Sequence, residues 1–150
     1  WTKRGKNEGW GIAFAECFGS IVGEVVKVSR KGDNGISIDQ VYAAVDCGWY
    51  VNPDIIRAQV EGSIVMALGA ATIHATNFRD GKAVESNFNQ YRMPRIQDIP
   101  PVEITIMDNE EKPGGVGEPS LPPFAPALCN AIFDLTGKRI RKLPFNINTV

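Results

Sequence analysis

One carboxylate stands within a segment dominated by glycine and proline, residues 113–123, with the sequence PGGVGEPSLPP. Three glycines and four prolines surround Glu118 there. Glycine lets another backbone or a ligand approach closely, whereas proline fixes φ and cannot continue a helix. We therefore expect a defined turn that presents Glu118. An ionised carboxylate that is partly sheltered from water is a competent general base.

The pattern alone leaves more than one role open for Glu118. The prolines after it predict that a helix begins near residue 122, and the amides of a helix start attract an anion. Glu118 is then either a structural cap, the commoner role for a residue in that position, or a catalytic base. The segment lacks the Gly-Lys-Ser/Thr ending of a phosphate-binding loop and a full G-x-G-x-x-G, which argues against a nucleotide site.

Other polar residues could also take part in a site. Gln59 and Glu61 fall within a predicted helix, and the amide of Gln59 could hold the edge of a heterocyclic ring, although most such residues are solvated. Asp46 could anchor a turn or cap the helix that follows it. His74 is the one histidine and is expected to be structural rather than a metal ligand.

The composition argues against several classes of protein. A net charge of -1 gives no electrostatic reason to expect nucleic acid. Cys17, Cys47 and Cys129 lack zinc-type spacing, so we assign no metal ligand and expect three small buried apolar residues. The longest mainly apolar run, residues 62–77, is shorter than the ~20 residues that cross a bilayer, so no transmembrane helix is expected.

Two predicted helices position the candidate residues. The first begins at Pro53, because Asn52 can accept the free amides of a first turn and proline suits the first helical position. The second covers residues 122–136, and Gly137 is placed to end it. Apolar residues follow helical spacing at Ile56, Val60, Ile64, Ala67, Leu68 and Ala71 in the first helix, and at Phe124, Leu128, Ala131, Ile132 and Leu135 in the second.

The strands are predicted from β-branched and aromatic residues between turn signals. The expected segments are two strands or one long bent strand over 10–28, a turn at 30–35, a strand over 36–48, a turn at 79–82, a strand over 101–108 and a short final strand over 140–145. The order strands, helix, strands, helix, strand predicts a mixed α+β fold with two main helices, and residues 1–150 fit a single domain.

Three separated stretches resemble one protein family: AVDCGWYVNPDIIRAQVEGSIVMALGAA, SNFNQYRMPRI and GGVGEPSLPPFAPALCNAIFDLTGKRIRKLP. In this order they look like the C-terminal part of the large, molybdopterin-binding subunit of the xanthine dehydrogenase and aldehyde oxidase family. Within that family the chain most resembles the beta subunit of isoquinoline 1-oxidoreductase and related bacterial aldehyde dehydrogenases. The resemblance extends from about Gly9 to Pro144, and it implies that residues 1–150 are a fragment of a longer subunit, either a processed product or an excised piece.

The resemblance also implies roles for individual residues. Glu118 corresponds to the active-site base of a molybdenum hydroxylase, which oxidises an N-heteroaromatic (isoquinoline-like) or aldehyde carbon with water-derived oxygen. Gln59 corresponds to a glutamine that hydrogen-bonds the pterin. The backbone of Gly115, Val116 and Gly117 is expected near the metal centre, where side chains would obstruct it.

The cofactors and partners follow from the same resemblance. It implies molybdenum-molybdopterin, with the cytosine dinucleotide form expected, and [2Fe-2S] clusters in a small partner subunit. The other partner is the rest of the large subunit, so the isolated chain is expected to be inactive. The complete enzyme is expected in a bacterial cytoplasm or periplasm. Two alternatives stay open, namely a non-catalytic cofactor-binding or assembly domain, and a structural module in which Glu118 is only a cap.

Overall fold

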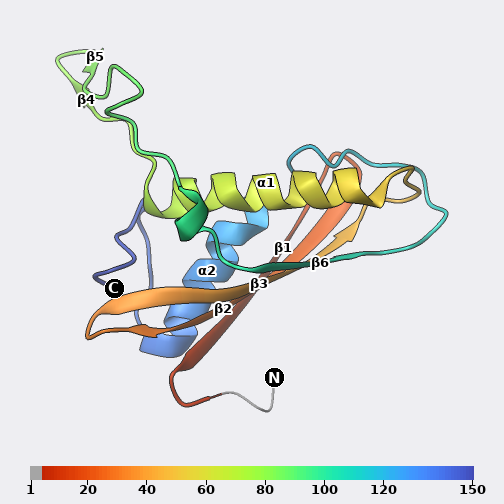
Figure 1. The fold of residues 1–150 in the computed structure, drawn as a ribbon, viewed down its shortest axis with the longest axis horizontal. Coiled ribbons are helices and arrows are strands. Elements are labelled where there is room, and N and C mark those ends of the chain that lie inside the picture. The colour runs from red at the N-terminus through yellow and green to blue at the C-terminus, as the bar shows by residue number, and fades with distance from the viewer. Residues whose placement is uncertain (1–4) are drawn as a thin grey trace.

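A four-stranded sheet with two long helices makes up the body of the protein (Figure 1). The computed structural model describes residues 5–150. The elements are β1 (Glu8–Cys17), β2 (Ser20–Lys31), β3 (Gly35–Asp46), α1 (Pro53–Thr72), β4 (Phe78–Arg79), β5 (Lys82–Ala83), the 3₁₀ helix η1 (Ile96–Asp98), β6 (Val102–Ile106) and α2 (Leu121–Thr136). The mixed α+β class with two main helices is confirmed.

The sheet has the strand order β1-β2-β3-β6. The first three strands form an antiparallel meander, and β6 pairs parallel to β3, from Val41 opposite Val102 to Val45 opposite Ile106. Since parallel neighbours need a crossover, the chain between them passes through α1. A small hairpin of β4 and β5 projects away from the sheet beyond the end of α1 (Figure 1).

Helix α2 lies directly on the first strand of the sheet. A methyl group at Gly11 would overlap the backbone of Ala127 and Ala131, so only glycine allows this approach. The Asn130 side-chain amide donates to the Ile12 carbonyl at 3.2 Å. The β1 strand and α2 are therefore in backbone contact.

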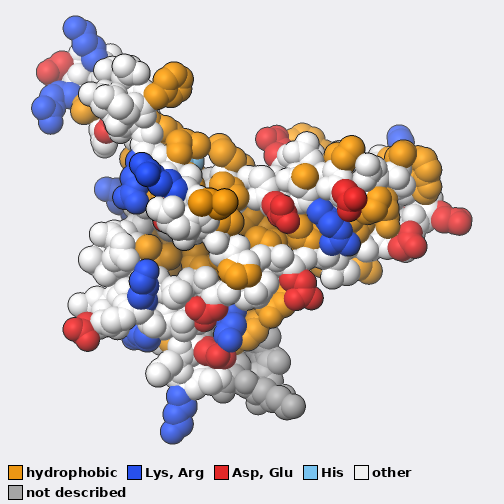
Figure 2. Space-filling view, viewed as in Figure 1, with side chains coloured by type: hydrophobic (Ala, Val, Ile, Leu, Met, Phe, Trp, Pro, Cys, Tyr) orange, Lys and Arg blue, Asp and Glu red, His pale blue; other side chains and the backbone are white. Residues whose placement is uncertain are grey.

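Both helices cover the same face of the sheet. The side chains that point to that face, such as Val22, Val26 and Val45, are fully buried. On the opposite face Ile12 and Phe14 are 59% and 75% exposed. One side of the sheet is thus open, and it also exposes Ile21 and Tyr42. Figure 2 shows further hydrophobic side chains along α1 and around its first residues.

The helix predictions are confirmed in detail. Asn52 is the N-cap of α1 and accepts the Asp54 amide at 2.9 Å, and Pro53 is in the first turn. Gly137 ends α2 in the left-handed conformation, with φ of 73°. All six apolar positions expected on α1 are buried, as are four of the five on α2, while Leu135 is half-buried.

The strand predictions were right except at the C-terminus. Residues 10–28 divide into two strands at a turn formed by Phe18 and Gly19. The turn at 79–82 and the strand near 101–108 are also present. The final strand predicted over 140–145 was wrong, because that segment is irregular and is held by isolated bonds such as Phe145 amide to Ala71 carbonyl. Pro144 lacks an amide for a ladder, and the segment does not pair with a strand edge.

Candidate functional site

The glycine- and proline-rich segment lies at the end of the sheet where β3 ends and α1 begins. Two backbone hydrogen bonds attach it there, and a third holds Glu111, just before the segment. The Gly114 amide donates to the Cys47 carbonyl at 2.9 Å, the Gly115 amide to the Phe18 carbonyl at 2.8 Å, and the Trp49 amide to the Glu111 carbonyl at 2.9 Å. The segment is therefore attached both to the turn between β1 and β2 and to the connection after β3.

Asp46 strengthens the same attachment. Its Oδ1 accepts the Gly48 amide at 3.3 Å and the Asn109 side-chain amide at 2.8 Å. Gly48 has φ of 69°, and a methyl group there would overlap the Lys112 carbonyl oxygen. Asp46 is thus a turn anchor, which was one of its two predicted roles, and Gly48 is required both by its conformation and by the close approach of the loop.

The three glycines before Glu118 have different surroundings. None of them adopts the left-handed conformation, so positive φ does not explain them. A methyl group at Gly114 would overlap the Gly19 carbonyl and the Ser20 hydroxyl, and one at Gly115 would lie 3.0 Å from Phe18 Cβ. At Gly117, by contrast, no heavy atom of residues 5–150 beyond its chain neighbours lies within 4 Å of such a methyl group. The loop is packed on one side and leaves open space beside the residue that precedes Glu118.

The Glu118 side chain is exposed and, among residues 5–150, makes no hydrogen bond or ion pair. The N-cap of α2 is Ser120, so the carboxylate of Glu118 does not cap that helix. The Leu121 amide donates to the Glu118 carbonyl at 3.0 Å, and the next two residues, Pro122 and Pro123, have no amide. The expected attraction of Glu118 to helix amides is therefore missing, since the prolines remove the donors.

Gln59 and Glu61 lie on exposed positions of α1, on the same helix as the buried Val60. Their side chains make no hydrogen bond or ion pair within the described part of the chain. The amide of Gln59 is thus available to a ligand, and within residues 5–150 no hydrogen bond joins it to Glu118.

A second carboxylate, Glu24, is buried in the core of the domain. Its side chain is 0% exposed, and neither oxygen has a hydrogen-bond partner within residues 5–150. Burial away from water raises its pKa to about 8, so the neutral acid predominates at pH 7. The sequence contained a signal for it, because Glu24 alternates in register with Val22 and Val26 on the buried face of β2.

The cysteines do not form a site in the described part of the chain. Cys47 is buried as expected, but Cys17 and Cys129 are only half-buried, and all three are free thiols. Burial raises the pKa of the Cys47 and Cys129 thiols, which makes them less reactive. Among residues 5–150, no group of three or more His, Cys, Asp and Glu side chains could hold a metal ion.

His74 packs within the fold, which agrees with its predicted structural role. Its ring lies over Gly69, where a methyl group would overlap the imidazole, and stacks obliquely on Tyr91 with 5.2 Å between ring centroids. The His74 amide donates to the Gly69 carbonyl at 2.7 Å.

No helix over residues 5–150 has the length and hydrophobicity to span a bilayer.

Comparison with known proteins points to one family. A family model described as a molybdopterin cofactor-binding domain matches residues 7–100, a range that ends before Glu118. The chain is 30% identical to the beta subunit of isoquinoline 1-oxidoreductase of Brevundimonas diminuta, over 96% of this chain and 19% of that protein. It is 36% identical, over 73% of this chain and 14% of the relative, to a membrane-bound aldehyde dehydrogenase of Gluconacetobacter polyoxogenes whose name includes pyrroloquinoline-quinone.

Solved structures share the fold. Quinoline 2-oxidoreductase of Pseudomonas putida 86 superposes with a TM-score of 0.74 at 22% identity, covering 83% of this chain and 17% of that chain. The chain thus corresponds to less than a fifth of the length of the proteins it matches.

Proposed function

This chain belongs to the molybdopterin cofactor-binding domain family, and we propose that it forms one wall of the active site of a molybdenum hydroxylase in which Glu118 is the general base. The observation that carries the proposal is an unpaired, exposed carboxylate on a loop held by backbone hydrogen bonds to Cys47 and Phe18. A catalytic base needs this combination of free oxygens and fixed position.

The surroundings of the loop fit a cofactor. The glycines at 114, 115 and 117 add no side chains of their own to the segment, and the space beside Gly117 is open. The backbone of Gly115, Val116 and Gly117 would lie against the metal end of the cofactor, and the free amide of Gln59 would hydrogen-bond the pterin. When bound, molybdenum-molybdopterin supplies a redox centre that accepts two electrons from the substrate. We propose the cytosine dinucleotide form.

Within this site Glu118 has one defined task. A carboxylate oxygen accepts the proton that a water-derived nucleophile loses as its oxygen is transferred to an electron-poor carbon. The attached loop restricts the position of the Glu118 carboxylate oxygen. Correct placement of a catalytic group is itself a large part of how an enzyme lowers the activation barrier. The prolines on either side, Pro113 and Pro119, limit the backbone freedom of the segment.

The substrate is proposed from the chemistry named in the relatives. Isoquinoline and quinoline are N-heteroaromatic, and the other relative is named for aldehydes. Both classes contain an electron-poor carbon that a nucleophilic oxygen can attack. We therefore propose an N-heteroaromatic or aldehyde substrate.

The remaining parts of the enzyme are proposed to come from outside residues 1–150. The open face of the sheet exposes Ile12, Phe14, Ile21 and Tyr42, and an apolar surface of this kind suits an interface. We assign this face to the rest of the large subunit, which also completes the substrate pocket. The [2Fe-2S] clusters are assigned to a small partner subunit.

The test is Glu118→Gln in the full-length protein assembled with its cofactor. The amide keeps the shape of the side chain but cannot take the proton, so turnover should fall by about 10²–10⁴-fold while molybdenum and pterin contents stay at the wild-type level. Glu110→Gln, which removes another exposed carboxylate from the same connection, should leave turnover unchanged.

Two outcomes would contradict the proposal. If Glu118→Gln lowers thermal stability but retains turnover per folded molecule, Glu118 is structural. If metal analysis of the purified protein finds no molybdenum while pyrroloquinoline-quinone is extracted from it, the cofactor assignment fails.

A further inference from the structure

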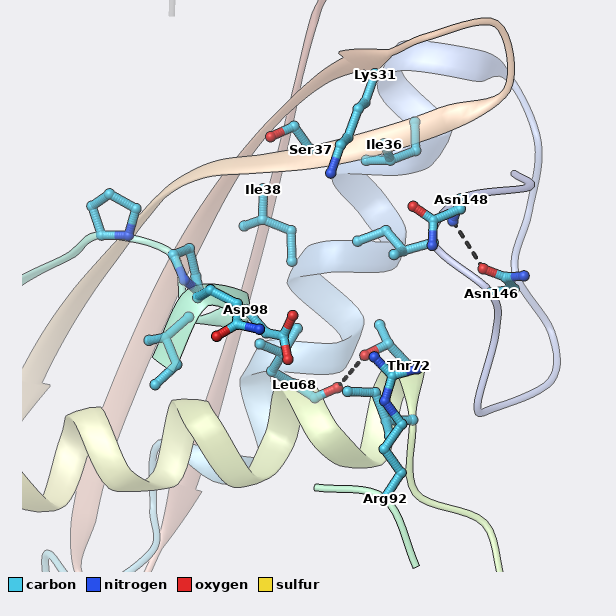
Figure 3. Close-up of a pocket in the computed structure, with 16 residues that line it drawn as sticks. Lys31, Ile36, Ser37, Ile38, Leu68, Thr72, Arg92, Asp98, Asn146 and Asn148 are labelled. Atoms are coloured by element: carbon cyan, nitrogen blue, oxygen red, sulfur yellow. Dashed lines mark hydrogen bonds between the residues drawn. The ribbon is translucent and has the colours of Figure 1, made fainter. Parts of the chain in front are cut away.

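A cavity of about 390 Å³ lies far from the Glu118 loop. It is bounded by the end of β2, the start of β3, the end of α1, η1 and residues 146–148 (Figure 3). Lys31, the last residue of β2, lines it, whereas Ser20, the first residue of β2, lies against Gly114 at the other end of the strand. A strand rises ~3.3 Å per residue, so the length of β2 separates the cavity from the catalytic loop.

The walls of the cavity are partly apolar. Ile36 and Leu68, which are 2% and 3% exposed, connect it to the core. Further apolar lining comes from Ile38, Ile73, Ile99 and Ile147. The volume falls within the range of roughly 300–1,000 Å³ that is usual for small-molecule sites.

Two cations face this space from opposite sides. Lys31 extends toward it from the strand, and Arg92 extends toward it from the segment before η1 (Figure 3). Within residues 5–150 neither side chain makes a hydrogen bond or an ion pair. Both residues are exposed, so their unpaired charges are free to turn toward an anion that enters the cavity.

One carboxylate, Asp98, also faces the cavity and offsets only one of the two positive charges (Figure 3). Asp98 Oδ2 accepts the Arg95 amide at 2.9 Å, and Asp98 makes no ion pair with Lys31 or Arg92. The lining therefore keeps an excess of one positive charge, counted over Lys31, Arg92 and Asp98. Asn146 and Asn148 add uncharged polar groups at the rim.

We propose that this cavity binds a small organic anion, with its phosphate or carboxylate group between Lys31 and Arg92 and its apolar body against the isoleucine walls. The planar guanidinium of Arg92 can hold two oxygens of such a group at once, while Lys31 adds a point charge. The site is separate from the Glu118 loop, so the proposal does not depend on the molybdenum chemistry.

The test is calorimetric titration of the full-length protein with phenyl phosphate, benzoate and inorganic phosphate. Saturable binding of phenyl phosphate or benzoate, tighter than that of inorganic phosphate, is expected because only the aromatic probes can use the apolar wall. Comparison of the two aromatic probes identifies the preferred anionic group. Failure of both to bind saturably would overturn the proposal, whatever the outcome for Glu118.

Substitutions at the two cations localise the binding. Lys31→Gln and Arg92→Gln should each weaken binding of the preferred aromatic probe by about tenfold or more, and Arg92→Lys should weaken it less than Arg92→Gln. Arg30→Gln is the matched control, because Arg30 is the exposed neighbour of Lys31 and does not line the cavity. An equal loss with Arg30→Gln would mean a diffuse surface charge effect and would refute the site.

A structural readout complements the titration. Crystals of the full-length protein soaked in sodium selenate should give an anomalous selenium peak between Lys31 and Arg92. A peak at that position in the wild-type protein that disappears in Arg92→Gln supports the assignment, and peaks confined to other surfaces contradict it.

Discussion

Gly114 lies against Ser20 so closely that a methyl group on Gly114 would overlap the Ser20 hydroxyl oxygen. The contact joins two segments that are far apart in the sequence, the start of β2 and the loop that carries Glu118. Together with the Gly114 amide bond to Cys47, it sets the position of the proposed base.

The packing of the loop predicts that alanine substitutions at Gly114 and Gly117 differ in their effect on stability. Gly114→Ala should displace the loop and destabilise the chain by about 1–3 kcal/mol, because the methyl group has no room. Gly117→Ala should change stability little, since the space there is open, but should lower the molybdopterin content of the assembled protein. Urea unfolding and pterin analysis measure the two effects. Equal destabilisation by both changes would argue against the loop packing described above.

Gln59→Leu tests the proposed contact to the pterin. The change removes the donors and acceptor of an exposed side chain, so the fold should be retained while the assembled protein loses pterin on dilution faster than wild type. Glu61→Gln, on the same exposed part of α1, is the control and should retain pterin normally. Unchanged retention in Gln59→Leu would remove Gln59 from the site.

Glu24 predicts an unusual dependence of stability on pH. Its pKa is raised from 4.5 to about 8 by burial, so the folded chain keeps a proton that the unfolded chain releases above about pH 4.5. Its contribution to the free energy of unfolding is therefore lost progressively between about pH 4.5 and 8.

The comparison of wild type with Glu24→Gln isolates this effect. The variant cannot ionise, so its stability relative to wild type should improve by a few kcal/mol between pH 5 and pH 8. Urea titrations at the two pH values measure the change, and Glu103→Gln, at an exposed position of β6, serves as control. A stability difference that is the same at both pH values would mean that Glu24 is ionised in the fold.

The close approach of α2 to β1 at Gly11 can be tested by substitution. Gly11→Ala should push α2 away and cost about 1–3 kcal/mol, because the methyl group would meet the backbone of Ala127 and Ala131. Gly23→Ala on the neighbouring strand should be neutral or slightly stabilising, since Gly23 has free space and glycine weakens a strand. Thermal denaturation compares the two, and a stable Gly11→Ala variant would contradict the close approach.

Much of this protein followed from local sequence. The limits of α1 and α2 were predictable because a cap, a first-turn proline and a terminal glycine act within one or two turns, as at Asn52, Pro53 and Gly137. The buried faces were predictable for the same reason, since Ile56 to Ala71 and Phe124 to Ile132 follow helical spacing. The hydrophobic alternation of β2 also indicates that Glu24 faces the core, although its burial without a hydrogen-bond partner was not anticipated.

The tertiary structure decided what depends on residues distant in the chain. A β-strand forms only where its backbone can hydrogen-bond to the edge strand of a sheet, and residues 140–145 pair with no such strand. Gly114 must be glycine because Ser20 lies against it, and Lys31 and Arg92 line one cavity because the β2–β3 hairpin meets the segment before η1. The motif around Glu118 was visible in the sequence, but the hydrogen bonds that hold it, and the absence of a capping role, required the fold. Local rules describe neighbours within a few residues, whereas contacts between separated segments depend on how the whole chain packs.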